Sequence, residues 1–173
     1  AMTGAGERVL VLDDLSAGVP ARLPADVPLV RGSSLDGGLL KRVLAEHAVT
    51  GVVHLAARKQ VAESVAQPTR YYQENVGGLA TLLEAVAEAG IERFLFSSSA
   101  AVYGSMHQCA LVESMECAPV SPYGRTKLVV EELLGDLAAA DDGWRIASLR
   151  YFNPIGAHGS GLIGEDVRAA PTN

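Results

Sequence analysis

The chain has 173 residues, of which 49% are hydrophobic and 20% are charged, and its formal net charge is -6. This composition is typical of one soluble domain with a real core. The acidic balance argues against nucleic acid as the main partner, because no basic stripe is available to neutralise phosphates. No apolar run approaches the roughly 18 residues that cross a bilayer, and no charged-then-apolar leader opens the sequence, so we expect a cytoplasmic protein without a membrane partner.

Apolar strands alternate with amphipathic helices along the sequence. Strands are predicted at residues 8–13, 28–31, 51–56, 93–97 and 145–150, and helices at 35–47, 69–89 and about 122–139. Continuous apolar strands separated by helices indicate a parallel sheet covered on both faces. Right-handed crossovers then give an α/β, doubly wound, mostly parallel sheet of Rossmann-like type.

Both ends of the sequence look like interruptions of a longer chain. Residues 1–6 resemble the last turn of a helix with its glycine stop, and residues 170–173 end in mid-loop. We interpret Gly4 and Gly6 as a turn, because a phosphate-binding glycine loop follows a strand and opens a helix, whereas this pair precedes a strand. We therefore expect an internal fragment.

The two cysteines, Cys109 and Cys117, lie in one loop-like region. Their spacing is not that of a metal site, and a disulfide scaffold would need more cysteines. We expect two free thiols in a reducing compartment and no metal.

Tyr123 and Lys127 open the last predicted helix. Ser121 suits its N-cap and Pro122 its first position, so the two functional side chains lie one turn apart on one face. A nearby ammonium favours the phenolate form of a tyrosine, and such a residue can exchange a proton with a substrate hydroxyl. Alone, the pattern is more typical of a solvated helix face.

Further candidate residues follow the carboxyl ends of the predicted strands. An acidic pair, Asp13 and Asp14, ends the first strand, where dinucleotide-binding folds bind a ribose. The small residues Ala56 and Ala57 would let a flat cofactor approach the backbone, whereas His54 reads as a buried histidine rather than a base. Three serines leave the fourth strand, and Ser99 could bond the same substrate oxygen as Tyr123.

The order of these parts is similar to that of the extended short-chain dehydrogenases/reductases, and within them to the UDP-glucose (UDP-galactose) 4-epimerases. The resemblance runs from Arg8 to Asn173 and depends on five segments taken together: 11–15, 53–57, 96–104, 121–127 and 149–158. It implies NAD-dependent interconversion of UDP-galactose and UDP-glucose, in galactose metabolism, by transient oxidation at carbon 4. Residues 1–173 would then be a partial NAD-binding Rossmann domain, lacking the first strand, the Gly-rich loop and the substrate domain.

The resemblance also implies roles for individual residues. Tyr123 would be the base for the sugar 4-hydroxyl, with Ser99 as its hydrogen-bonding partner and Lys127 on the nicotinamide ribose. The cofactor side would be formed by Asp13 and Asp14 at the adenine ribose, Ala56, Ala57 and Lys59 beside the phosphates and nicotinamide, and Asn75, Ser97 and Phe152 along NAD. Asn153 and Asn173 would contact the UDP-sugar, and the helices starting near Thr69 and Pro122 are candidate faces for a homodimer.

Three alternatives stay open at this point. A nucleotide-sugar 4,6-dehydratase needs an additional acid just after the serine-rich strand, and Ala100 and Ala101 occupy that stretch, which disfavours it. Another extended short-chain dehydrogenase is the second alternative, and an inactive fragment unable to hold NAD is the third. Gly32, Ser33 and Ser34 stand where the resembling family usually has Gly-Asp, which weakens the expected grip on adenine.

Overall fold

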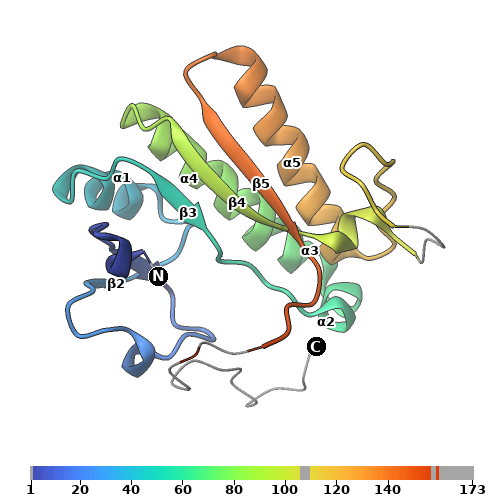
Figure 1. Cartoon of the computed structure of the whole chain (residues 1–173), viewed down its shortest axis with the longest axis horizontal. Coiled ribbons are helices and arrows are strands. Elements are labelled where there is room, and N and C mark those ends of the chain that lie inside the picture. The colour runs from blue at the N-terminus through green and yellow to red at the C-terminus, as the bar shows by residue number, and fades with distance from the viewer. Residues whose placement is uncertain (1, 106–109, 157–158, 160–173) are drawn as a thin grey trace.

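The structure is a computed structural model that describes residues 2–105, 110–156 and 159. Its strands run parallel and form two groups (Figure 1). One group pairs β1 (Val11–Asp13) with β2 (Leu29–Arg31), and the other has the order β3 (Val52–His54), β4 (Arg93–Ser99) and β5 (Arg145–Tyr151). The predicted parallel α/β arrangement of Rossmann-like type is confirmed.

A gap separates the two groups of strands. β1 pairs on one side with β2, β3 pairs on one side with β4, and within the described residues no strand lies between β1 and β3. The first strand is also shorter than predicted. Pairing with β2 begins at Val11, and the N–H of Val11 donates to the carbonyl of Pro28 at 3.0 Å. Residues 8–10 precede this point, so they have no residues of β2 opposite them to pair with.

Helices α1 (Gly37–Glu46), α4 (Gly78–Glu88) and α5 (Pro122–Ala140) lie behind the strands in the view of Figure 1. Asp36 caps α1 by accepting the N–H of Leu39 at 2.9 Å, as a short polar side chain does at a helix start. Two short helices, α2 (Val61–Ala66) and α3 (Pro68–Tyr71), follow β3 and pack against α5. The main core unites apolar residues of these layers: Leu40, Leu44, Leu79, Leu82, Leu83, Ala85, Val86, Ile91, Phe94, Phe96, Val130 and Leu134.

The long helix predicted over residues 69–89 is divided into three parts. α3 passes into a π-helical segment, η3 (Tyr72–Gly77), which passes into α4. One wider turn of this kind rotates the residues that follow it relative to an uninterrupted α-helix, and such turns are frequent at functional sites. Asn75 lies within η3 and is buried.

Short 3-10 turns complete the architecture: η1 (Thr3–Ala5), η2 (Pro20–Arg22) and η4 (Ala100–Tyr103). The predicted turn at the start is present, since Gly6 closes η1 with φ +87°. None of the helices in the described part of the chain is both long and apolar enough to cross a membrane.

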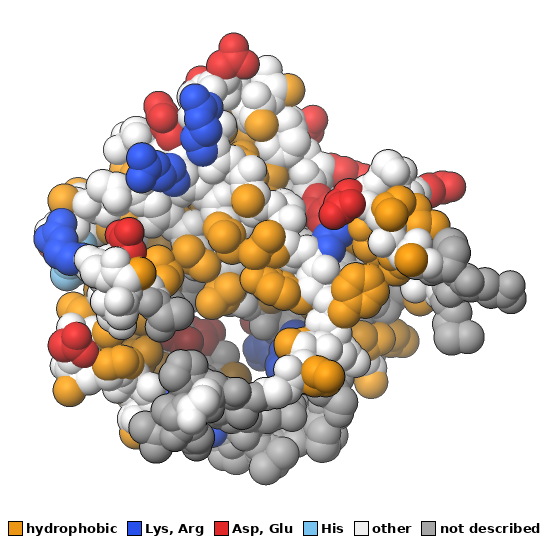
Figure 2. Space-filling view, in the orientation of Figure 1, with side chains coloured by type: hydrophobic (Ala, Val, Ile, Leu, Met, Phe, Trp, Pro, Cys, Tyr) orange, Lys and Arg blue, Asp and Glu red, His pale blue; other side chains and the backbone are white. Residues whose placement is uncertain are grey.

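The chain's own helices cover one face of the three-stranded sheet. The opposite face carries exposed apolar side chains, among them Val53, Leu149 and Tyr151, which keep 42%, 38% and 46% of their surface in contact with solvent. Hydrophobic side chains gather on this side in the space-filling view (Figure 2). The expectation of helices on both faces is therefore met on one face by the described residues.

Candidate functional site

The start of α5 is built as the sequence predicts. The Ser121 hydroxyl accepts the N–H of Gly124 at 3.1 Å, and Pro122 occupies the first turn, where its missing N–H costs nothing. Tyr123 and Lys127 therefore lie one turn apart, four residues being close to one helical repeat. Tyr123 is partly exposed, whereas Lys127 is buried.

Lys127 reaches back to the carboxyl end of β4. Its ammonium donates to the Ser97 carbonyl at 2.6 Å and lies 4.7 Å from the centre of the Phe96 ring. Burial lowers its pKa from the ordinary 10.5 to about 8, because the charged form loses water. A charge held in this way is fixed in position relative to β4, rather than swinging on the helix surface.

His54 is buried beside this lysine, as the sequence predicts. Its ring lies near those of Phe94 and Phe96, with centroids 6.3 and 6.2 Å away. Burial, with the charge of Lys127 adding to it, lowers the His54 pKa to about 4, so the imidazole is neutral near pH 7.

Ser99 ends β4 and caps the start of η4. Its hydroxyl accepts the N–H of Ala101 at 3.2 Å, which starts η4. α5 approaches η4 closely at Gly124, where a Cβ would lie 2.7 Å from the Ala101 carbonyl oxygen. Gly104 leaves η4 with φ +85°, a conformation that other residues rarely adopt. The structure thus brings the end of β4, η4 and the Tyr123 turn together.

Asp13 and Asp14 shape the loop that follows β1. Asp13 accepts the N–H of Leu15 at 2.7 Å, and Asp14 accepts that of Ser16 at 2.8 Å. The hydrogen bonds from Ser16 keep the pKa of Asp14 below its usual value. Both carboxylates lie at the carboxyl end of β1, as expected for a ribose-binding acid.

A cavity of about 1740 Å³ occupies the gap between the two groups of strands. Figure 2 shows the hollow on this face, with acidic and basic side chains inside it. Its lining includes residues from β1, β3, β4 and η3, together with residues 26–28 and 32–35 on either side of β2. Of the predicted site residues, Asp13, Asp14, Ala56, Ala57 and Asn75 line the cavity, and Ser33 and Ser34 line it as well. Ser99, Tyr123 and Lys127 are not among its lining residues, but His54 and Asn75, which lie beside the Lys127 turn, are.

Asn75 connects the segment after β3 to α5. Its amide oxygen accepts the N–H of Arg58 at 2.8 Å, and its amide nitrogen donates to the Arg58 carbonyl at 3.0 Å and to the Thr126 hydroxyl at 3.2 Å. Both amide hydrogens are therefore engaged by protein groups. Asn75 holds the segment after β3 against α5, next to the turn that carries Lys127; its direct contact with NAD stays a prediction.

The remaining predicted residues contribute no side chain to the contacts described above. Lys59, Phe152 and Asn153 are exposed, with 61% of the Phe152 surface accessible, and Ser97 contributes its carbonyl to Lys127. Asn173 and Cys109 lie outside the described residues. Cys117 is a free thiol, as expected.

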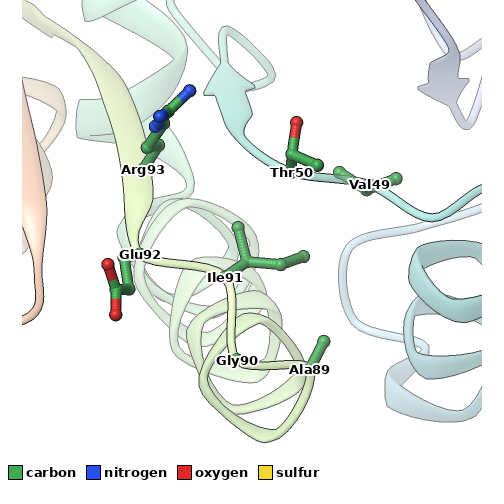
Figure 3. Close-up of a pocket in the computed structure, with 7 residues that line it drawn as sticks. All are labelled: Val49, Thr50, Ala89, Gly90, Ile91, Glu92 and Arg93. Carbon is green, nitrogen blue, oxygen red and sulfur yellow. The ribbon is translucent and has the colours of Figure 1, made fainter.

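A second, smaller pocket lies at the other end of the sheet. It has a volume of about 370 Å³ and is lined by Val49, Thr50 and residues 89–93 (Figure 3). These residues precede β3 and β4, whereas parallel α/β sheets bind their ligands beyond the carboxyl ends of the strands. We do not assign a function to this pocket.

One polar cluster was not predicted from the sequence. Glu131 and Arg150 form an ion pair of 2.6 Å between α5 and β5, and the cluster also includes Ser98 and Tyr103. A signal was present, because Glu131 lies four residues after Lys127 and eight after Tyr123, on the same helix face.

The sequence matches the NAD dependent epimerase/dehydratase family over residues 1–170. The chain belongs to this family. It is 43% identical to a UDP-glucose 4-epimerase of Neisseria meningitidis serogroup C, over 97% of the chain and 52% of the relative, and 40% identical to one of Bacillus subtilis, over 99% and 53%.

Solved structures of the family agree with the fold. A UDP-glucose 4-epimerase from Stenotrophomonas maltophila, with bound NAD and formylated UDP-arabinopyranose, superposes with a TM-score of 0.94 at 40% identity, covering 99% of this chain and 53% of that one. One from Bifidobacterium longum, in complex with NAD+ and UDP, gives 0.92 at 37% identity, with 99% and 54% covered. The chain thus spans about half the length of the relatives that it matches.

Proposed function

We propose that this chain forms the dinucleotide-binding half of an NAD-dependent UDP-glucose 4-epimerase, which interconverts UDP-galactose and UDP-glucose. The observation that carries the proposal is the joining of Tyr123 and Lys127 on α5 to the serine-rich end of β4. The 43% identity to a UDP-glucose 4-epimerase and the NAD in related structures support it. The absence of an acid at Ala100 and Ala101 distinguishes this reading from a 4,6-dehydratase.

The residues of the cavity fit a dinucleotide. Asp13 and Asp14 offer carboxylates for ribose hydroxyls, and the small Ala56 and Ala57 leave room beside β3 for a flat ring. NAD, when bound, accepts a hydride from carbon 4 of the sugar and returns it. Lys59, Asn75, Ser97 and Phe152 complete the proposed cofactor side, and an Asp at position 13 favours NAD over NADP, since its carboxylate repels a 2′-phosphate.

Three side chains carry out or support proton transfer at the sugar 4-hydroxyl. Tyr123 takes the proton of the sugar 4-hydroxyl and gives it back, while the Ser99 hydroxyl bonds the same oxygen. Lys127, fixed by the Ser97 carbonyl, supplies a positive charge one helical turn from Tyr123 and offers a donor to the nicotinamide ribose. Asn153, and Asn173 beyond the described residues, would hold the UDP-sugar.

The size of the cavity has a structural reason under this proposal. At about 1740 Å³ it exceeds the roughly 300–1,000 Å³ of ordinary ligand pockets. A strand between β1 and β3, followed by a Gly-rich loop, would fill part of it and supply N–H groups for the pyrophosphate. We propose that the complete protein provides this strand, and that residues 1–173 alone bind NAD weakly.

The test is a chimera in which residues 1–173 replace the matching half of the Neisseria meningitidis relative. Incubated with UDP-galactose, it should form UDP-glucose, whereas a dehydratase would form a 4-keto-6-deoxy sugar nucleotide. Tyr123→Phe should lower kcat by roughly 10²–10⁴-fold with NAD affinity within about twofold. Tyr72→Phe, on the exposed side of η3, is the matched control and should leave kcat unchanged. Near-normal turnover of Tyr123→Phe would refute the assigned chemistry.

A homodimer is part of the proposal for the whole protein. Val61 and Val65 are exposed on α2, which packs beside α5, and such apolar side chains suit a subunit contact. Analytical ultracentrifugation of the chimera should give twice the monomer mass, and Val65→Glu should lower it. A monomer with full activity would exclude this part.

A further inference from the structure

Glu131 and Arg150 form a nearly enclosed ion pair. The guanidinium Nε donates to both carboxylate oxygens of Glu131 at 3.1 Å, and Nη2 donates to Oε2 at 2.6 Å. Side-chain exposure is 11% for Glu131 and 21% for Arg150. A pair so placed depends on both partners, because removing one leaves a charge with little water around it.

Each partner of this pair binds a segment next to the proposed site. The Ser98 hydroxyl donates to Glu131, so α5 is tied to the residue immediately before Ser99. Nη1 of Arg150 donates to the Tyr103 hydroxyl at 2.8 Å and to the Glu113 carbonyl at 3.3 Å, and the guanidinium lies 4.8 Å from the centre of the Tyr103 ring. The pair thus ties together the ends of β4 and β5, η4, the loop before α5, and α5 itself.

The spacing of the bonded residues along α5 fixes the position of this helix relative to β4. Tyr123, Lys127 and Glu131 are four residues apart and share one face of the helix. Lys127 binds the carbonyl of Ser97, and Glu131 binds the hydroxyl of Ser98. Two successive turns are therefore fixed to two successive residues of β4, which sets how far α5 can slide or rotate relative to Ser99.

We propose that Glu131 and Arg150 are positioning residues for the proposed epimerase reaction, setting the distance between the Tyr123 and Ser99 hydroxyls. The inference rests on the proposed function, because it concerns the same acid/base group. Neither residue touches the reacting atoms. They act by holding α5 and η4 in one arrangement on the end of β4, and an error of about 1 Å in such a geometry can lower a rate roughly 10²-fold.

The kinetic test uses the chimera described above and three matched variants. Ser98→Ala removes the tie to β4 but leaves the ion pair, Glu131→Gln keeps the shape but removes the charge, and Glu132→Gln makes the same change at the next, exposed position of α5. We expect kcat for UDP-galactose to fall roughly 10–100-fold in Ser98→Ala and Glu131→Gln, with KM and bound NAD within about twofold. Glu132→Gln should match the parent.

A second measurement examines the arrangement itself. Amide hydrogen exchange in the chain should quicken at residues 97–104 and 121–127 in Ser98→Ala, while exchange in α4 stays as in the parent. If Glu131→Gln fails to fold, Ser98→Ala alone decides the question.

The outcomes separate the two proposals. An unchanged kcat in Ser98→Ala, or a kcat that falls only in proportion to the folded or NAD-loaded fraction, would overturn the positioning role while Tyr123→Phe still abolishes turnover. Normal turnover of Tyr123→Phe would instead overturn the proposed function. A selective loss of kcat in Ser98→Ala, absent in Glu132→Gln, supports the inference.

Discussion

The two groups of strands differ in how they are held. In the β3–β4–β5 group, seven-residue strands β4 and β5 pair along their whole length and rest on fully buried side chains such as Leu79. β1 and β2 have three residues each, and among the described residues before Leu40 none is buried. The proposed acid/base group is therefore carried by a fully paired sheet with a buried core. The proposed nucleotide side, in contrast, borders the gap between β1 and β3.

The strongest test of this contrast is to shorten one leucine in the core behind the β3–β4–β5 group and one leucine in β2. Leu79→Ala, in α4, should lower the free energy of unfolding by about 2–5 kcal/mol, because it leaves a cavity in a closely packed core. Leu29→Ala, in half-buried β2, should cost roughly 1 kcal/mol. Urea unfolding of the chain measures both, and equal costs would contradict the contrast.

Lys127 offers a test by pH. Its pKa is lowered to about 8 in the folded chain from the ordinary 10.5, so between these values the unfolded chain binds more protons. The lysine therefore makes the free energy of unfolding rise with pH across this window, by roughly 3 kcal/mol in all. Below pH 8 the full penalty of burying the charge applies.

The check is the difference between the parent and Lys127→Met from pH 7 to 10.5. The increase in the free energy of unfolding that remains in Lys127→Met comes from the other titrating groups. The additional increase in the parent comes from Lys127. A parallel pair of curves would show that Lys127 is solvated.

Asn75 joins the segment after β3 to α5. Asn75→Ala should cost about 1–3 kcal/mol, since it leaves the N–H and carbonyl of Arg58 without their partner. Gln73→Ala, at an exposed position of the same π-helical segment, is the matched control and should cost less than about 0.5 kcal/mol. Similar losses in thermal unfolding would mean that η3, rather than the amide, matters.

The smallest effect is expected at a surface pair between α1 and α4. Lys41 and Glu88 lie 2.8 Å apart, with side chains 51% and 58% exposed. A double-mutant cycle with Lys41→Ala and Glu88→Ala should give a coupling of about 0.2–1 kcal/mol that disappears in 1 M salt. A larger, salt-resistant coupling would show that this pair holds the two groups together.

Local signals in the sequence were enough for much of the fold. Ser121 and Pro122 predicted the start of α5 because capping depends on neighbouring residues alone, and the helix ends within a residue of the expected position. The π-helical turn at Asn75 was missed, since one additional residue per turn leaves almost no trace in an apolar periodicity. The shortening of β1 was also missed, because strand length depends on a partner that the strand's own residues do not reveal.

The candidate site divides in the same way. Lys127 near the end of β4 follows from helix spacing and the order of strands. The contacts of Arg150 with Glu131 and Tyr103 do not, because they join residues that only the three-dimensional packing brings together. Whether Asp13, Lys59 or Phe152 touches NAD stays a prediction of the resemblance.

The gap between β1 and β3 also has a consequence for how the chain behaves in isolation. Within the described residues each of these strands pairs on one side only, and an unpaired strand edge readily accepts an extended peptide. At high concentration, residues 1–173 should therefore self-associate through the unpaired edges of β1 and β3. A short peptide of the right register, supplied separately, should compete with that association and restore a continuous sheet.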